Sequence, residues 1–304
     1  MTLLAGSAGC RIRPAGEDTG HVKGLSVQKR MSLNSVELSG LTRDSLVGGA
    51  QRFLSISDSR NEILEINPDA SRIVAHGINA GRCPAVADAS QFEAIVADKD
   101  RIFVLQESSS LIFVLSGEDF SCQGVLTLTT AHDARIDSDW KADPNSRGEG
   151  FLLLKNGHII VAKEKDPVTL VEFAPMGEGV SGFRTGDAVT GRDVFPMPRG
   201  SDTVYSAIKS WPLSSNSEFK VADISDLAIG PDGSIYALSD QSNGFGKIDS
   251  TLRPDEKTFK VKSFWQFPKK IIKPEGLSIG EDSHIYVTTD GGEGLDNFFV
   301  LDPF

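Results

Sequence analysis

The stretch RGEGFLLLKNGHIIVAKEKDP, residues 147–167, contains two short apolar runs separated by a turn. Asn156-Gly157, between FLLL and HIIVA, is a strong short-range signal for a β-hairpin. The apolar runs belong in a dry core, yet a glutamate stands at the outer end of each strand, Glu149 before the first and Glu164 after the second. The two carboxylates are either solvated strand ends or the two sides of one binding site.

The same plan recurs in five segments of the chain. Each begins with two small or acidic residues, which are followed by a short apolar strand, a polar turn, and a second apolar strand that ends in an acidic residue. The segments read ELSGLTRD…RFLSISDS, FEAIVADKDRIFVLQES, GEGFLLLKNGHIIVAKEK, ISDLAIGPDGSIYALSDQ and PEGLSIGEDSHIYVTTDG. Their anchor residues are Ser39, Glu93, Glu149, Ser225 and Glu275, at intervals of 54, 56, 76 and 50 residues. We interpret the Gly/Pro-rich stretch 176–202, in the longest interval, as an insertion in an outer strand.

Further apolar runs follow each hairpin, and four short strands per repeat are typical of β-propeller blades. The last repeat lacks a fourth strand, which GLSVQKRMSL (24–33) could supply to close the ring. We therefore predict an all-β fold, a five-bladed β-propeller with four antiparallel strands per blade, as one domain over residues 26–304. A sixth blade built from TVYSAIKSW (203–211) is the alternative.

Antiparallel pairing places the start of the first strand and the end of the second on the same face of a propeller. The second acid follows the anchor by 14 or 15 residues in four repeats and by 19 in the first. Where the anchor is serine, an acid two residues earlier keeps the same face of the strand. The first-strand acids, predicted as metal ligands, are Glu37, Glu93, Glu149, Asp223 and Glu275. The second-strand acids, predicted to bind a ligand at the channel mouth, are Asp58, Glu107, Glu164, Asp240 and Asp290.

Ten carboxylates around one opening would raise each other's pKa unless a cation intervened. Calcium, or another divalent cation, is the economical partner because it takes about 6–8 oxygen ligands in flexible geometry. Lys163, Lys165, Lys273 or a cationic ligand could supply part of the charge instead. Ordinary solvated strand ends are the simplest alternative.

The loop AHDARIDSDWKADPNSRG, residues 131–148, has D-x-D spacing but lacks the glycine and terminal glutamate of an EF-hand. We expect a solvated loop beside the mouth, with Trp140 packed on a blade. His132, in this loop, is the one histidine placed to serve chemistry there.

The net charge of −11 argues against a nucleic-acid partner, which would require a basic stripe.

The opening MTLLAGSAGC resembles the end of a bacterial lipoprotein signal with Cys10 as the lipidated residue, although Ser7 replaces the usual Leu and only nine residues precede the cysteine. Residues 1–25 are predicted as a signal-like or lipoprotein-like N-terminus and tether, and membrane contact is expected only through this anchor. Cys83 and Cys122 could pair in an oxidising compartment.

ELSGL, FEAI, GEGF, DISDL and PEGL, each followed by its second strand, occur together with LQES, AKEKDP and LSDQS. On these motifs the chain resembles the SdiA-regulated family of bacterial envelope propellers over roughly residues 33–302. It is similar, more distantly, to esterase-like phytase and NHL-type propellers. The resemblance implies a five-bladed propeller with a central calcium site, no settled activity, and a location in the periplasm, as an outer-membrane lipoprotein or as a secreted protein. It carries over to the motif acids Glu37, Glu93, Glu149, Asp223, Glu275, Glu107, Glu164 and Asp240. Ala94 departs from the family pattern, which has Gly at that position.

We therefore expect a monomeric calcium-binding propeller of the cell envelope that binds a small molecule or an envelope protein through its acidic mouth. The first alternative is a metal-dependent hydrolase of the lactonase, esterase or phosphoesterase type, with a rim carboxylate as general base. The second is a scaffold whose flat face binds another envelope protein and whose channel holds only water.

Overall fold

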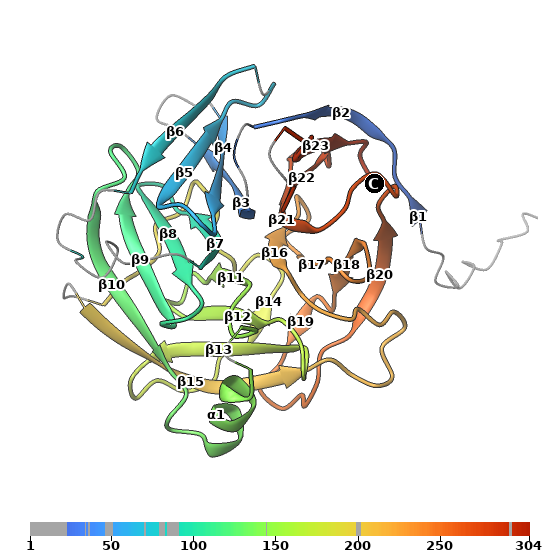
Figure 1. Ribbon diagram of the computed structural model, residues 1–304. Helices are drawn as coiled ribbons and strands as arrows, with labels where there is room; N and C mark the ends of the chain where they lie inside the picture. Colours follow the sequence, from blue (N-terminus) through green and yellow to red (C-terminus); the bar gives the residue numbers. More distant parts are fainter. Residues whose placement is uncertain are drawn as a thin grey trace, which may run out of the picture.

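The computed structural model describes residues 23–33, 35, 37–45, 51–69, 71–78, 83, 91–143, 145–198, 202–291 and 294–304. The predictions for Cys10 and for the tether up to residue 22 lie outside these ranges. Within them the chain forms strands and one short helix, which confirms the all-β class. Figure 1 shows the sheets arranged around a common centre.

Each of the first three repeats forms four strands that pair in sequence order from the centre outward. The first comprises β3 (Leu38–Ser45), β4 (Gln51–Ser57), β5 (Glu62–Ile66) and β6 (Ile73–Gly77). The second comprises β7 (Phe92–Ala97), β8 (Arg101–Gln106), β9 (Leu111–Ser116) and β10 (Cys122–Thr129). The third comprises β11 (Gly150–Leu153), β12 (Ile159–Lys163), β13 (Thr169–Pro175) and β15 (Asp202–Pro212). The outermost strands β10 and β15 pair in parallel and join the second and third repeats into one eight-stranded sheet.

The last two repeats each recruit a strand from the start of the chain. The fourth comprises β16 (Asp226–Ile229), β17 (Ile235–Ser239), β18 (Gly244–Ile248) and β20 (Val261–Gln266), and β1 (Lys23–Gly24) pairs in parallel with β20. The fifth comprises β21 (Pro274–Ile279), β22 (Ile285–Thr289) and β23 (Phe298–Leu301), and β2 (Val27–Met31) adds to it antiparallel to β23. The prediction that 24–33 supplies the missing strand is confirmed.

The inner strands contact one another in turn around the centre, in the order β3, β7, β11, β16, β21 and back to β3. They are buried because a neighbouring sheet covers each face, which explains the continuous apolar run FLLL in place of an alternating pattern. Gly150 shows how closely these strands approach, since a Cβ atom there would lie 2.5 Å from the backbone nitrogen of Leu227. A Cβ on Gly40 would lie 2.9 Å from the Cα of Ala94, so the glycine of β3 makes room for the alanine of β7.

The predicted insertion lies between β13 and β15. It contains β14 (Phe183–Arg184), which pairs with β19 (Thr251–Leu252) of the fourth repeat. The stretch 203–211, from which the alternative sixth blade would be built, lies within β15 and pairs with β13 as an outer strand.

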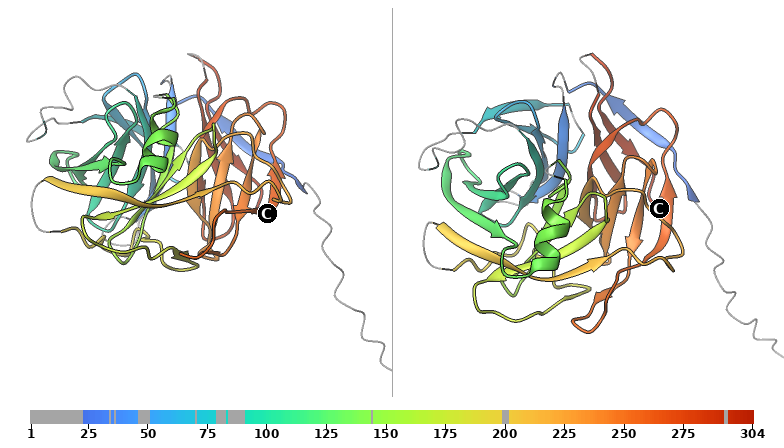
Figure 2. Two further views of the ribbon diagram at one scale, coloured as in Figure 1. Left: turned by 90° about the horizontal axis from the view of Figure 1, so that it is seen from below. Right: turned by 60° about the horizontal axis from the view of Figure 1, so that its bottom comes forward.

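The acidic loop contains the helix α1 (Ala134–Lys141), which the sequence analysis did not predict. Asp133 caps the helix by accepting hydrogen bonds from the backbone nitrogens of Arg135 and Ile136. Trp140 is buried and packs edge-on against Phe173 of β13. The predicted packing role of Trp140 is therefore confirmed, and α1 lies on the outside of the third repeat (Figure 2).

Cys83 and Cys122 form a disulfide, with Cα atoms 5.8 Å apart. It links Cys83, which precedes β7 in the sequence, to the first residue of β10 in the second repeat. Among the described residues, no helix has the length and apolar character needed to cross a membrane.

Candidate functional site

The hairpin of β11 and β12 holds its two glutamates at one end. Gly150 lies opposite Ala162, and the backbone nitrogen of Glu149 donates to the Ala162 carbonyl at 3.1 Å. The backbone nitrogen of Glu164 donates to the Ser146 carbonyl at 3.2 Å, just ahead of Glu149. The register thus keeps both acids at the entry of the inner strand.

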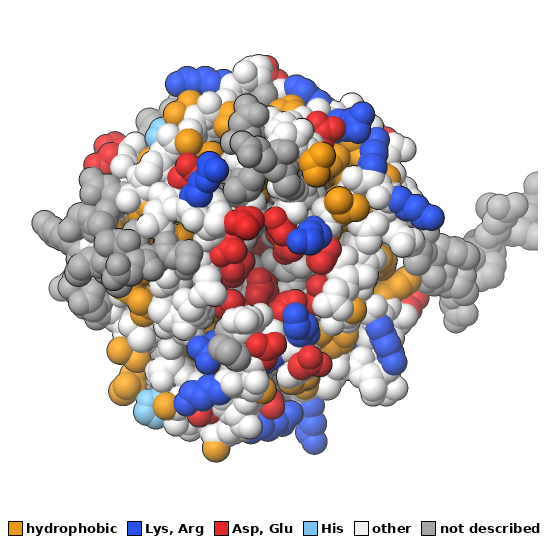
Figure 3. Space-filling model, in the orientation of Figure 1, with side chains coloured by type: hydrophobic (Ala, Val, Ile, Leu, Met, Phe, Trp, Pro, Cys, Tyr) orange, Lys and Arg blue, Asp and Glu red, His pale blue; other side chains and the backbone are white. Residues whose placement is uncertain are grey.

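The other repeats also begin with an antiparallel hairpin, with a register shift at the anchor residue in the first, second and fifth repeats, and the five hairpins together form a single acidic cavity of about 360 Å³. It is lined by Glu37, Ser39, Asp58, Gln91, Glu93, Glu107, Asn145, Glu149, Glu164, Lys165, Asp223, Ser225, Asp240, Glu275 and Asp290. All ten acids singled out in the sequence therefore meet at one opening. Figure 3 shows acidic side chains around a hollow at the centre of the face seen in Figure 1. We call this cavity the acidic mouth.

Hydroxyl and backbone donors orient several of the carboxylates. The Ser39 hydroxyl donates to Glu93 Oε2 at 3.1 Å, which links the first and second repeats. The backbone nitrogen of Arg147 donates to Glu107 Oε1 at 2.8 Å, which links the second and third. Asp223 accepts from the Ser239 hydroxyl and from the backbone nitrogen of Gln241. These contacts connect carboxylates of the mouth to neighbouring strands and loops.

Burial raises the pKa of three of the glutamates well above the usual value for a glutamate side chain. Burial, followed by the charges of Asp58 and Glu107, raises the pKa of Glu93 to about 8. Burial and then the charges of Asp240 and Glu93 raise the pKa of Glu275 to about 9. Burial also raises the pKa of Glu107 to about 7, against the opposing effect of the Arg147 backbone hydrogen bond. At neutral pH the mouth therefore holds protons on carboxyl groups that would be ionised in water.

The other acids with shifted pKa values follow the same rule. Burial raises the pKa of Glu149 well above its usual range, and the charges of Glu93, Glu107, Glu164 and Glu275 raise it further. Burial is also the largest cause of the raised pKa values of Asp58, Asp223 and Asp240, with a neighbouring acid adding to each shift. Glu149 is thus affected by acids of the second, third and fifth repeats.

The lysines near the mouth neutralise little of this charge. Lys165 Nζ lies 2.8 Å from Glu164 Oε1, and Lys273 Nζ lies 2.7 Å from Asp290 Oδ2, so each pairs with one rim carboxylate. Lys163 is buried and donates to the backbone carbonyls of Lys165 and Asp166. The inner glutamates are therefore left without a cationic partner among the described side chains that line the mouth.

The donor set of the acidic mouth fits a hard divalent cation. Carboxylate, amide and hydroxyl oxygens are the ligands of calcium and magnesium, and neither histidine nor cysteine is among the described lining residues. Asp58 Oδ1 is buried and has no hydrogen-bond partner within the described part of the chain. No group of three described His, Cys, Asp or Glu side chains is arranged to hold a metal ion as it stands.

Three polar residues of the channel were not among the residues predicted from the sequence. Gln91 and Asn145 line the mouth from loops that precede β7 and β11. Asp226 is buried and does not line the mouth. Its Oδ2 accepts hydrogen bonds from the backbone nitrogens of Leu277 at 2.8 Å and Leu41 at 3.4 Å. Its Oδ1 accepts from the backbone nitrogen of the next residue, Leu227, at 2.7 Å. Burial raises the pKa of Asp226 well above its usual range. Its place in DISDL, directly after the anchor Ser225, is the signal that could have revealed it.

The acids of the 131–148 loop serve the loop itself. Asp133 caps α1, Asp137 pairs with Lys141 at 2.9 Å, and Asp143 accepts from the backbone of Asn145 at 3.0 Å. Neither these acids nor the exposed His132 line the acidic mouth. The loop contributes Asn145 to the cavity and its backbone to Glu107.

The inner ring of strands and the acidic mouth define a protein of the β-propeller type, and the comparisons agree. The sequence profile of the SdiA-regulated family matches residues 23–292, so the chain belongs to this family. No curated protein matches the sequence.

Solved propeller-type structures are similar in shape but distant in sequence. Glutaminyl cyclase from Myxococcus xanthus has a TM-score of 0.53 and 13% identity, over 92% of this chain and 96% of its own. A luciferin-regenerating enzyme has a TM-score of 0.50 and 10% identity, over 92% and 96%. A calcium-binding regucalcin from Agrobacterium tumefaciens has a TM-score of 0.49 and 12% identity, over 93% and 95%. At these identities the likeness concerns the fold alone.

Proposed function

We propose that the acidic mouth binds a divalent cation, calcium in the first instance, and that the loaded mouth recognises a small-molecule or envelope-protein ligand. One observation carries the proposal: ten carboxylates from all five repeats line one cavity, and burial raises the pKa of Glu93 and Glu275 to about 8 and 9. A cluster this acidic and this short of lysines is stabilised by a cation that replaces its protons.

The inner glutamates are the ligands that we assign. They are Glu93, Glu149 and Glu275, at the beginnings of the inner strands β7, β11 and β21. The charges of Glu93 and Glu275 raise the pKa of Glu149. Glu107 and Asp58 line the same cavity from the ends of second strands, and Asp58 Oδ1, which has no hydrogen-bond partner among the described residues, is available as a metal ligand. A bound cation would supply positive charge at the centre of the mouth and a site for an anionic or carbonyl group of a ligand.

The test is calorimetric titration of the chelator-stripped protein with calcium, together with thermal melting with and without the ion. We expect saturable binding and a higher Tm, because an ion that binds only the folded state stabilises it. Glu149→Gln should abolish binding, whereas Glu118→Gln, the same change at an exposed position outside the mouth, should leave it intact. Absence of binding with an unchanged melting curve would count against the proposal.

One observation favours a hydrolase as the second candidate function. Glu107 has a pKa raised by burial to about 7 and shares a hydrogen bond with the Glu149 carboxyl group. A carboxylate that titrates near neutrality is suited to act as a general base toward water beside a metal ion. A screen of lactones, aryl esters and phosphoesters, with and without calcium, separates this role from pure binding. Calcium-dependent turnover that Glu107→Gln and Glu149→Gln abolish would establish the hydrolase.

We also propose a five-bladed ring and an envelope location. The strand order supports the count, because the eight-stranded sheet divides at the parallel β10–β15 contact into two units of four strands, each with its own inner strand. The Cys83–Cys122 disulfide supports an oxidising compartment such as the periplasm. Labelling of the full-length protein with a radioactive fatty acid, compared with Cys10→Ala, tests the lipid anchor, and light scattering tests the monomeric state.

A further inference from the structure

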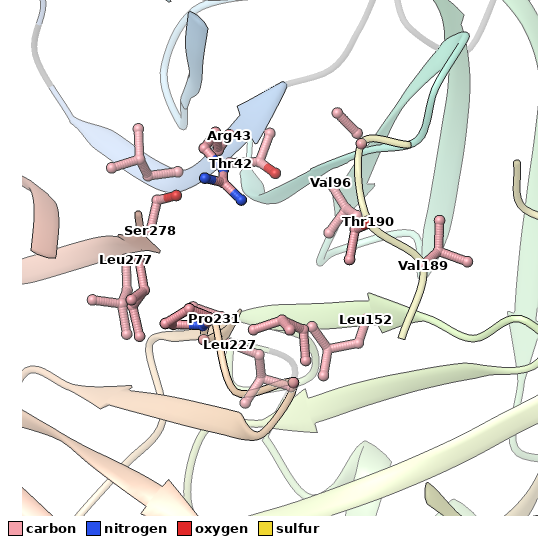
Figure 4. Close-up of a pocket in the computed structure, with 18 of the residues that line it drawn as sticks. Thr42, Arg43, Val96, Leu152, Val189, Thr190, Leu227, Pro231, Leu277 and Ser278 are labelled. Atoms are coloured by element: carbon pink, nitrogen blue, oxygen red, sulfur yellow. The ribbon is translucent and has the colours of Figure 1, made fainter. Parts of the chain in front are cut away.

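A second cavity of about 400 Å³ lies at the far ends of the inner strands. The acidic mouth takes residues from the starts of these strands, whereas the second cavity takes residues from their later positions. These are 41–43 of β3, 95–97 of β7, Leu152 of β11, 227–229 of β16 and 277–279 of β21. Figure 4 shows their side chains around one space. We call it the far cavity.

Asp226 separates the far cavity from the acidic mouth. Its buried carboxylate reaches from β16 to the backbone nitrogens of Leu41 in β3 and Leu277 in β21. The leucines at positions 41, 227 and 277 line the far cavity directly beyond these hydrogen bonds. The two cavities therefore have different linings, one rich in carboxylates and one in which aliphatic side chains are interspersed with polar ones.

The insertion builds one wall of the far cavity. The backbone nitrogen of Val189 donates to the Leu153 carbonyl at 2.7 Å, so the insertion continues the edge of β11. Val189, Thr190, Gly191 and Arg192 then line the cavity. The backbone nitrogen of Lys99 donates to the Asp193 carbonyl at 2.8 Å, which carries the insertion across to the second repeat. The insertion, which lengthens the interval between the third and fourth repeats, thus forms one wall of the far cavity.

The charge balance of the far cavity is positive, in contrast to the mouth. Its described lining includes three charged side chains, Arg43, Arg192 and Glu281. Glu281 Oε1 is 2.7 Å from Arg192 but 3.7 Å from Arg43, so the glutamate is engaged mainly by Arg192. Arg43 has 23% of its side chain exposed, and its Nη1 is buried with no hydrogen-bond partner in the described part of the chain. The partly exposed Arg43 guanidinium is therefore only weakly engaged by Glu281 and can donate to an incoming acceptor.

We propose that the far cavity binds an amphipathic monoanion, a carboxylate with an apolar body of aliphatic or aromatic carbon. The carboxylate would accept from the guanidinium of Arg43, a residue that Figure 4 shows at the edge of the space. The apolar body would lie against the leucine and valine side chains of the inner strands and insertion. The volume of about 400 Å³ is within the usual range for small-molecule pockets. This site is independent of the cation proposed for the mouth.

The probe is octanoate, titrated into the full-length protein by calorimetry in the presence of a calcium chelator. Octanol and octylamine carry the same chain without a negative charge and serve as ligand controls. We expect saturable binding of octanoate, weaker binding of octanol and none of octylamine. Equal binding of octanoate and octanol, or no binding of octanoate, would overturn the proposal, and neither result bears on the calcium site.

Three variants locate the site. Arg43→Gln should weaken octanoate binding by about 10- to 100-fold, the usual worth of a charged hydrogen bond. Thr190→Trp, on an exposed position of the insertion, should block the cavity and give a similar loss. Arg30→Gln removes the same charge from an arginine that pairs with Asp296 elsewhere and should change nothing. Unchanged binding in both Arg43→Gln and Thr190→Trp, each folded by circular dichroism, would refute the assignment.

Discussion

Calcium binding at the acidic mouth should release protons, and raising the pH is the perturbation that reveals it. At pH 7 the raised pKa values of about 8 for Glu93 and about 9 for Glu275 keep both groups protonated, and Glu107, with a pKa of about 7, is half protonated. A carboxyl group must lose its proton before it can bind a metal ion. The sign follows directly: affinity for calcium rises with pH until these groups are ionised in the free protein.

The size of the effect follows from the same pKa values. Ionising Glu93 and Glu275 at pH 7 costs about 1 and 2 pK units, together about 4 kcal/mol. We therefore expect at least two protons released per ion at pH 7, from Glu93 and Glu275, and the raised pKa values of Glu149 and Glu107 add to this number. The apparent calcium affinity should rise by about 100-fold or more per pH unit near pH 7, because each displaced proton is worth about tenfold per unit.

Calorimetry in two buffers of different ionisation enthalpy measures the proton count, because released protons add the buffer's heat to the signal. Glu275→Gln should reduce the count by about one, and Glu118→Gln, outside the mouth, should leave it unchanged. A calcium affinity that is constant from pH 6 to 9, with equal heats in both buffers, would show that these glutamates are not protonated ligands.

Three further predictions concern the scaffold that holds the mouth. Asp226→Ala should lower the free energy of unfolding by about 3 kcal/mol in urea, because three backbone N–H groups lose their acceptor; a change below about 0.5 kcal/mol would contradict its role as a tie between strands. Gly150→Ala should destabilise by about 1–3 kcal/mol, since its Cβ would meet backbone atoms of β16, whereas Gly77→Ala, with open space around it, should be neutral. Loss of the disulfide in Cys83→Ala should cost about 4 kcal/mol for the 39-residue separation, and dithiothreitol should lower the Tm of the parent but not of this variant.

The acidic mouth should also make the free energy of unfolding of the calcium-free protein depend on pH. The folded state retains protons on Glu93 and Glu275 that the unfolded chain has lost above its usual glutamate pKa of 4.5. Stability in the absence of calcium therefore falls as the pH rises from about 5 to 9. A bound cation removes this penalty, so the ion and the fold support each other.

Local pattern in the chain was enough to predict the hairpins, their ends and the family. The spacing of 14 or 15 residues between an anchor and the second acid is a property of one antiparallel hairpin, and FLLL and HIIVA are recognisable as buried strands. Because each hairpin is local, the sequence determined that Glu149 and Glu164 lie at one end of it. The strand that completes the last repeat was likewise recognisable from 24–33.

Only the tertiary structure decided how these hairpins pack against one another, and therefore which side chains are buried and which cavities form. Asp226 and Leu41 are 185 residues apart, and no local pattern joins them. The short helix α1 was missed because its eight residues depend on packing of Ile136 and Trp140 against the third repeat more than on helical periodicity. Burial, which raises the pKa of the inner glutamates, exists only once neighbouring sheets close around them. The far cavity arises in the same way, where the insertion crosses the ends of strands that are distant in sequence.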